Sequence, residues 1–312
     1  MVAWAVRACW PIFGVVAASA VLAAQPPFRA ERPFQTGIEV TSITATVTDG
    51  EGHLVVDLPR EAFEVFEDGD PQPITQFTRE RVPVGLGVLL DISDSMFGRR
   101  IEDARTAVDR FLFDLLDPAD EFFLMAFNHK PRGMTGWTRV QTEVQRALAG
   151  LRPSGGTAIY DAIVESMPLI DARSRTRGAL LVISDGADTA STAGLRDVRA
   201  ALLRSDVFIY AIAIDSPERQ PINTRVNAEA LREITGESGG RTEIVRSSTD
   251  LVEATARIAE ELNSQYVLGY TSPRGADNKF HSIRVRIRAP GGAEYRVRSR
   301  SGYIATPMRR RM

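Results

Sequence analysis

Five oxygen-bearing side chains stand in three short motifs whose types and spacing suit metal binding. Residues 91–95 read Asp-Ile-Ser-Asp-Ser, residues 155–157 read Gly-Gly-Thr, and residues 184–186 read Ser-Asp-Gly. The candidate metal ligands are Asp91, Ser93, Ser95, Thr157 and Asp185. In the first motif the oxygen-bearing side chains alternate along the chain, so they can converge on one point.

Two carboxylates and three hydroxyls, without histidine or cysteine, favour one hard divalent cation. Mg²⁺ is the first choice, with Mn²⁺ or Ca²⁺ as alternatives. If the hydroxyls bind directly and the carboxylates act through water, the ion stays electrophilic and keeps an open position. A carboxylate from a protein partner is the natural ligand for that position. The motifs therefore predict binding through a cation rather than catalysis.

The sequence around these motifs alternates buried strands with helices. Nearly continuous apolar runs, typical of strands buried on both faces, occupy residues 82–90, 122–127, 179–184 and 207–214. Apolar residues at helical spacing occupy residues 101–116, 158–170 and 251–262. This alternation predicts an α/β fold with a doubly wound, mostly parallel sheet over residues 82–262. Since such sheets bind ligands at the carboxyl ends of their strands, we expect the five side chains at one rim, outside the core.

Both flanks of this region read as short β-strands. The expected strands are residues 40–48, 54–56, 63–67 and 74–77 on one side and residues 266–270, 283–288 and 295–298 on the other. Each flank is too small to bury a core alone. We predict that residues 34–81 and 264–304 form one β-sandwich into which the α/β domain is inserted. Two separate β appendages are the alternative.

The composition argues against nucleic-acid binding. The 312-residue chain has a formal net charge of −2, whereas a general nucleic-acid binder needs a basic face. Arginine alternates with apolar residues in residues 283–288 and 295–298, which predicts strands with one solvated face. A polyanion-binding surface is the alternative interpretation. Residues 305–312, which include Arg309 to Arg311, are expected to form a basic tail.

The first 24 residues read as an export signal peptide. Arg7 is the only charge before residue 29, and residues 8–24 are apolar or small. An uncleaved membrane anchor is disfavoured because the apolar core is short and contains Pro11. We expect a periplasmic or secreted protein in which residues 25–33 are a linker and no stable membrane insertion remains. Cleavage would also remove Cys9, the single cysteine.

The three motifs, in this order, resemble the metal-ion-dependent adhesion site (MIDAS) of von Willebrand factor type A and integrin I domains. The resemblance covers about residues 82–262. It implies a doubly wound fold, a Mg²⁺- or Mn²⁺-type ion, and protein ligands that often offer an acidic side chain. The flanking segments, with Phe63–Gly69 and Tyr266–Tyr270, are similar to exported bacterial "VWFA-related" proteins. That second resemblance implies architecture and export but no biochemical function.

Several neighbours of the motifs carry separate expectations. Asp94 should point away from the two serines. Met96 and Phe97 could contact a partner at the rim, although half-buried packing is the simpler interpretation. Asp161 and Asp188 could brace the metal loops or cap a helix or turn.

Two further function classes compete with metal-dependent binding. A phosphatase with an aspartyl nucleophile needs an aspartate two residues after the first, where this chain has Ser93. A serine hydrolase needs a paired histidine, and neither Ser93 nor Ser95 stands in a Gly-x-Ser-x-Gly motif. Only His129 is expected near the rim. The remaining class is an envelope structural or assembly protein in which the metal purely stabilises the fold.

Overall fold

The computed structural model describes residues 40–175, 177–185, 187–215, 228–288 and 294–306. The expected signal peptide (1–24) and linker (25–33), and Arg309 to Arg311, lie outside these residues. Within them, no helix is both long and apolar enough to cross a membrane. Ala305 is buried, and its N–H and carbonyl bond to Lys279 and Asn278, so the basic tail expected from residue 305 begins after it.

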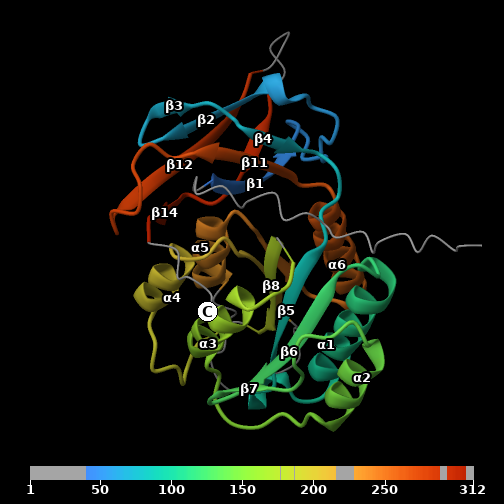
Figure 1. Cartoon of the computed structure of the whole chain (residues 1–312). Helices are drawn as coiled ribbons and strands as arrows, with labels where there is room; N and C mark the ends of the chain where they lie inside the picture. Colours follow the sequence, from blue (N-terminus) through green and yellow to red (C-terminus); the bar gives the residue numbers. More distant parts are fainter. Residues whose placement is uncertain (1–39, 176, 186, 216–227, 289–293, 307–312) are drawn as a thin grey trace, which may run out of the picture. The chain divides into compact units, whose positions relative to one another are not determined.

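A six-stranded sheet forms the centre of the α/β part of the chain (Figure 1). Its strand order is β10-β9-β8-β5-β6-β7, and all pairs are parallel except β6 with β7. The strands are β5 (Val84–Asp91), β6 (Glu121–Phe127), β7 (Pro131–Gly133), β8 (Arg177–Ser184), β9 (Phe208–Ile214) and β10 (Thr242–Val245). Every residue of β5, β6, β8 and β9 is buried, as expected for strands covered on both faces.

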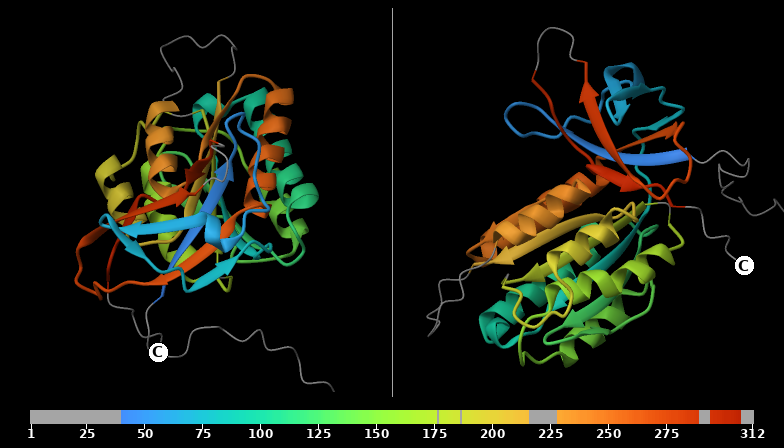
Figure 2. Two further views of the ribbon diagram at one scale, coloured as in Figure 1. Left: turned by 90° about the horizontal axis from the view of Figure 1, so that it is seen from above. Right: turned by 90° about the vertical axis from the view of Figure 1, so that its left-hand side faces the viewer.

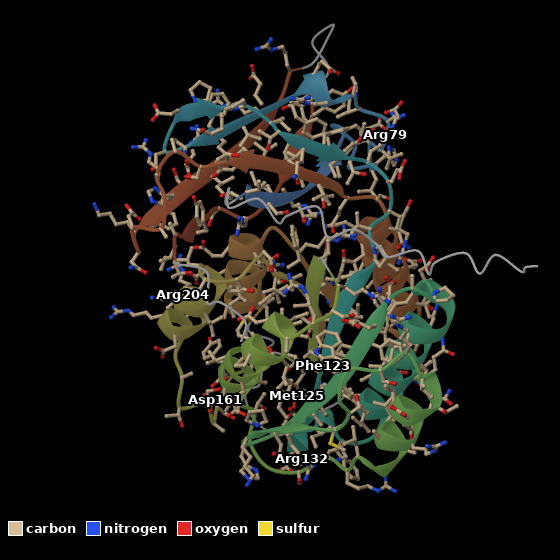
Figure 3. The ribbon with its side chains drawn as sticks, viewed as in Figure 1. Arg79, Phe123, Met125, Arg132, Asp161 and Arg204 are labelled. Atoms are coloured by element: carbon tan, nitrogen blue, oxygen red, sulfur yellow. The ribbon has the colours of Figure 1, made fainter. Side chains whose placement is uncertain are left out.

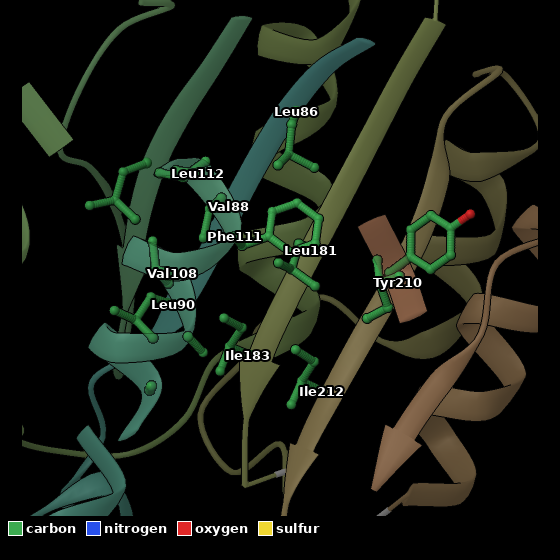
Figure 4. Packing of buried hydrophobic residues seen from close by; sticks show 14 of the residues in the cluster. Leu86, Val88, Leu90, Val108, Phe111, Leu112, Leu181, Ile183, Tyr210 and Ile212 are labelled. Carbon is green, nitrogen blue, oxygen red and sulfur yellow. The ribbon is translucent and has the colours of Figure 1, made fainter. Parts of the chain in front are cut away.

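Helices cover both faces of this sheet (Figure 2). One face packs against α1 (Arg99–Arg110) with its π-helical continuation η3 (Phe111–Leu115), α2 (Gln141–Gly150) and α6 (Ser248–Asn263). The other packs against α3 (Ile159–Asp171), α4 (Leu195–Leu202) and α5 (Ala228–Ser238). Residues of β5 contribute to the cores on both faces of the sheet. Leu86, Val88 and Leu90 pack on the α1 face (Figure 4). Leu89 packs on the α3 face. Each buried leucine stabilises the fold by roughly 2 kcal/mol.

The flanking segments form two antiparallel four-stranded sheets, ordered β13-β1-β11-β4 and β14-β12-β2-β3. The strands are β1 (Val40–Thr48), β2 (Phe63–Glu67, preceded by the 3₁₀ turn η1, Arg60–Ala62), β3 (Asp70–Gln72), β4 (Gln76–Thr78), β11 (Tyr266–Thr271), β12 (Phe280–Ile287), β13 (Arg296–Arg298) and β14 (Gly302–Ile304). Side chains from both sheets share one core that includes Ile43, Val65, Leu268 and Ile283.

The predicted fold class, a doubly wound sheet with a β-sandwich built from both flanks, is confirmed. β1 pairs with β11 and β13, and β2 pairs with β12, so the alternative of two separate appendages is wrong. Arg284 and Arg286 of β12 are exposed while Ile283 and Val285 are buried, as the alternation predicted. The strand expected at residues 54–56 is wrong, because only Leu54 forms an isolated bridge, to Thr48.

A buried carboxylate joins the sandwich to the α/β part. Glu261 of α6 is 1% exposed and accepts hydrogen bonds from Thr46 of β1 (3.1 Å), Tyr210 of β9 (2.9 Å) and Arg298 of β13 (2.5 Å). Gln265 donates to both Thr46 and Tyr210, which closes the network. A charge is tolerated at this depth because its oxygens are fully hydrogen-bonded.

We expect Glu261→Ala to lower the free energy of unfolding by about 3 kcal/mol, because Arg298 and Tyr210 would lose a buried partner. Urea unfolding measures the change. Glu253→Ala on the same helix is the control. The Glu253 side chain is 62% exposed and, among the described residues, pairs with Arg257 alone, so a change below about 0.5 kcal/mol is expected. Equal losses in the two variants would contradict the role given to Glu261.

Candidate functional site

The carboxyl ends of β5 and β8 bring two of the motifs together. The strands are parallel neighbours, with Leu90 opposite Ile183, so Asp91 and Ser184 end their strands at the same level. The helices that follow in sequence lie on opposite faces, α1 after β5 and α4 after β8. Doubly wound sheets hold ligands at such a divergence, next to the carboxyl ends of the strands.

Asp91 is the last residue of β5 and is 0% exposed. Its Oδ1 accepts the Ser93 N–H (2.7 Å) and its Oδ2 accepts the Ser184 hydroxyl (2.5 Å). Burial raises the pKa of the Asp91 carboxyl to about 7, and the nearby Asp185 charge adds to the rise. The bonds from Ser184 and Ser93 act in the opposite direction. Among the described residues, the hydrogen-bond partners of the Asp91 carboxylate are these two neutral donors, and no ion pair joins it.

The loop after β5 places two hydroxyls next to each other. The oxygens of Ser93 and Ser95 lie 2.9 Å apart, and residues Asp94–Met96 form the 3₁₀ turn η2. Met96 is fully buried and Phe97 is 75% exposed, so only Phe97 is available to a partner. Asp94 is exposed, as expected.

The Gly-Gly-Thr loop is bonded directly to this turn. The Ile92 carbonyl accepts the Ser154 N–H (2.8 Å), and the Gly155 carbonyl accepts the Asp94 N–H (2.9 Å). Gly155 has φ +77°, and a Cβ there would lie 3.0 Å from Nδ1 of His129, so this position requires glycine. His129 thus lies beside the site loops, as anticipated.

Thr157 is held from the opposite side. Its N–H donates to the Thr189 hydroxyl (3.0 Å), and its carbonyl accepts from the N–H groups of Thr189 and Ala190. The loop after β8 therefore fixes the Thr157 backbone. Thr157 as a whole residue is 5% exposed. Within the described part of the chain, its side chain makes no hydrogen bond to the other four candidates.

Two aspartates brace these loops, as one of the alternatives for them proposed. Asp188 accepts the Tyr160 N–H (3.1 Å) and the Ser191 hydroxyl (2.6 Å). Asp161, labelled in Figure 3, accepts the N–H groups of Thr192 and Ala193. The segment after β8 is thereby tied to the first turn of α3.

Asp185 makes an ion pair that the sequence did not indicate. The Nη1 of Arg100, on the first turn of α1, donates to Asp185 Oδ2 (3.0 Å) and to the Ser95 carbonyl (2.9 Å). Both charged side chains are only 7% exposed. Arg100 and Ser184 are site residues that the sequence analysis did not name as candidates. Ser184 is the first residue of the Ser-Asp-Gly motif, whereas Arg100 belongs to none of the three motifs.

Four of the five candidate ligands are buried, although none of the five belongs to the hydrophobic core clusters on the two faces of the sheet. Asp91, Ser93, Thr157 and Asp185 are at most 6% exposed, and only Ser95 is half-buried. The loops that carry them nevertheless meet at one end of the sheet. Within the described residues no group of three or more His, Cys, Asp or Glu side chains could hold a metal, so hydroxyls must complete any coordination sphere. Two carboxylates with neighbouring hydroxyls fit a hard cation that also carries water.

This arrangement defines a doubly wound α/β domain with oxygen-bearing side chains at its topological switch point, where β5 and β8 end side by side. Residues 86–187 match the family model of the von Willebrand factor type A domain. The chain therefore contains a von Willebrand factor type A domain. Such domains typically serve as protein-interaction modules.

Inter-alpha-trypsin inhibitor heavy chains are among the curated proteins similar to part of this chain. The inter-alpha-trypsin inhibitor heavy chain H2 of Mesocricetus auratus is 24% identical over 190 residues, which cover 55% of this chain and 20% of that protein. Heavy chain H4 of Bos taurus is 32% identical over 95 residues, covering 29% of this chain and 10% of that protein. The match thus spans a fifth or less of these relatives' length.

Among solved structures, the chain is similar to a von Willebrand factor type A protein from Catenulispora acidiphila. The TM-score is 0.51 at 12% identity, over 86% of this chain and 75% of that one. At this identity the similarity concerns the fold alone.

We expect Asp91→Asn to stabilise the metal-free protein above pH 7. The pKa of Asp91 is raised from 3.8 to about 7, so between these values the folded chain holds a proton that the unfolded chain has lost. The contribution of the Asp91 carboxyl to the free energy of unfolding therefore decreases as pH rises above 3.8, and the decrease is complete above about pH 7. Asparagine cannot ionise, so the gain should be on the order of 2 kcal/mol at high pH and vanish near pH 4.

Thermal unfolding in chelator across this pH range measures the effect. Asp94→Asn, an exposed change in the same loop, is the control and should shift stability little at either pH. An Asp91→Asn gain that is independent of pH would exclude the buried charge as its cause.

Proposed function

We propose that this protein is an exported binding module that holds a protein partner through one divalent cation, with Mg²⁺ the first choice. Asp91, Ser93, Ser95, Thr157 and Asp185 would hold the ion, and an acidic side chain of the partner would complete its coordination. The observation that carries the proposal is the Ser93–Ser95 hydroxyl pair, 2.9 Å apart beside the buried Asp91 carboxylate. The cation would supply an electrophilic centre without being consumed.

The types of ligand oxygen at this site support a cation whose positive charge is only partly neutralised by the protein. Hydroxyls carry no charge, and Asp91 already uses one lone pair on each oxygen for Ser93 and Ser184. A cation bound mainly by hydroxyls and water retains attraction for an external carboxylate. Phe97, 75% exposed on the same loop, lies where a partner that reaches Ser95 would contact it.

Binding is favoured over turnover by the surroundings of the two serines. A nucleophilic serine needs a base within hydrogen-bond reach. Within the described residues, Ser93 and Ser95 bond to each other and neither has a histidine partner. Export is proposed from the first 24 residues alone.

The first test is metal binding by calorimetry with Mg²⁺ and Mn²⁺. We expect Ser93→Ala to weaken binding about tenfold or more, because a ligand oxygen is lost while the fold loses only one small polar group. Ser301→Ala, which removes an exposed sandwich hydroxyl that bonds to Glu237, is the matched control and should bind as the wild type does. Unchanged binding in Ser93→Ala would remove this serine from the site.

The second test is capture of a partner from cell-envelope extract by the immobilised chain. Capture should require Mg²⁺ or Mn²⁺, disappear in chelator and fail with Ser93→Ala. Capture that ignores chelator, in a chain whose melting temperature falls without metal, would favour the structural-metal alternative. Metal-dependent phosphoester hydrolysis that Ser93→Ala abolishes would favour a hydrolase.

A further inference from the structure

The candidate site contains a permanent positive charge. Arg100 projects from the first turn of α1, and its Nη1 lies 3.0 Å from Asp185 Oδ2 and 2.9 Å from the Ser95 carbonyl. The arginine side chain is 7% exposed, so water screens it poorly. Arginine stays protonated at every physiological pH. The same guanidinium thus contacts two of the three site loops.

We propose that Arg100 is a built-in counter-cation. Its positive charge stabilises the two carboxylates when no metal is bound, and it weakens the binding of a metal ion because the two positive charges repel each other. This inference rests on the proposed metal site and concerns its regulation.

The first half follows from the cost of burying like charges. Asp91 and Asp185 are 0% and 6% exposed at adjacent strand ends, and two such carboxylates repel each other in a medium of low polarity. Arg100 pairs with one of them and fixes the Ser95 carbonyl at the same time. Removing one partner of a buried ion pair leaves the other uncompensated, which is strongly destabilising.

The second half follows from the charge balance. With Asp91 and Asp185 both ionised, the two carboxylates and the Arg100 guanidinium leave the site with one net negative charge. A divalent cation would convert this to one net positive charge, which a single carboxylate from a partner would neutralise. Arg100 therefore disfavours the ion alone and favours the ion together with an acidic partner.

Arg99 provides a matched control on the same helix turn. Its side chain is 69% exposed and pairs with Asp103 at 3.7 Å and with Ser248, away from Asp185. It has the same charge and a neighbouring position, but water screens it, and its ion pair and hydrogen bond within the described residues go to Asp103 and Ser248 rather than to the site loops.

The experiment measures Mn²⁺ and Mg²⁺ binding by calorimetry, and melting in chelator, for wild type, Arg100→Gln, Arg100→Lys and Arg99→Gln. We expect Arg100→Gln to bind Mn²⁺ about tenfold more tightly and to melt at least about 5 °C lower in chelator. Saturating Mn²⁺ should restore most of that loss. Arg100→Lys, which keeps the charge, should bind within about threefold of wild type, and Arg99→Gln should match wild type in both measurements.

Three outcomes would overturn the proposal. Wild type that binds metal while Arg100→Gln binds it equally or less tightly would refute the counter-cation and leave the proposed function intact. Arg100→Gln that stays unfolded in chelator and in saturating Mn²⁺ alike would make Arg100 a purely structural residue. No metal binding by wild type or any folded variant would remove the proposed metal site itself.

Discussion

The buried carboxylate of Asp91, at the end of a central strand, constrains the strand order, the register and the loop geometry of the α/β domain. Asp91 has no contact with water, so its two oxygens must find donors within the protein, and they find the Ser93 N–H and the Ser184 hydroxyl. The first donor requires a sharp turn directly after β5. The second requires β8 to lie next to β5 in this register. Strand order, register and loop geometry are thus linked through one side chain.

Arg100, on α1, offsets part of the cost of burying carboxylates at these strand ends, because its guanidinium pairs with Asp185. Oxygen ligands for a metal are costly to assemble without the metal, because their lone pairs and charges repel one another. In this domain the cost is met partly by hydrogen bonds and partly by an arginine on the helix that follows the turn. The proposed metal site would therefore keep its arrangement in the metal-free chain and be preorganised for the ion.

Periodicity predicted the sheet and its helices well, because each of those elements buries a pattern that is visible within about ten residues. The three motifs likewise indicated which strand ends would meet. The sequence did not reveal the Arg100–Asp185 pair, whose members are 85 residues apart, or the depth at which Asp91 lies. Both depend on tertiary packing that no local pattern encodes. The strand expected at residues 54–56 is reduced to a short contact with the end of β1, where Leu54 bridges Thr48 and the Val55 N–H donates to the Val47 carbonyl.

The pairing of β1 has a consequence for the order in which the chain can fold. Its two neighbours, β11 and β13, both follow the α/β domain in sequence, and Thr46 meets Glu261 across 215 residues. A nascent or translocating chain therefore presents β1 with open edges until more than 200 further residues have emerged, whereas β5, β6 and β8 can assemble among themselves. The α/β domain should be complete first, and the sandwich should close last. Any factor that shields an unpaired strand of the incomplete chain would act on β1.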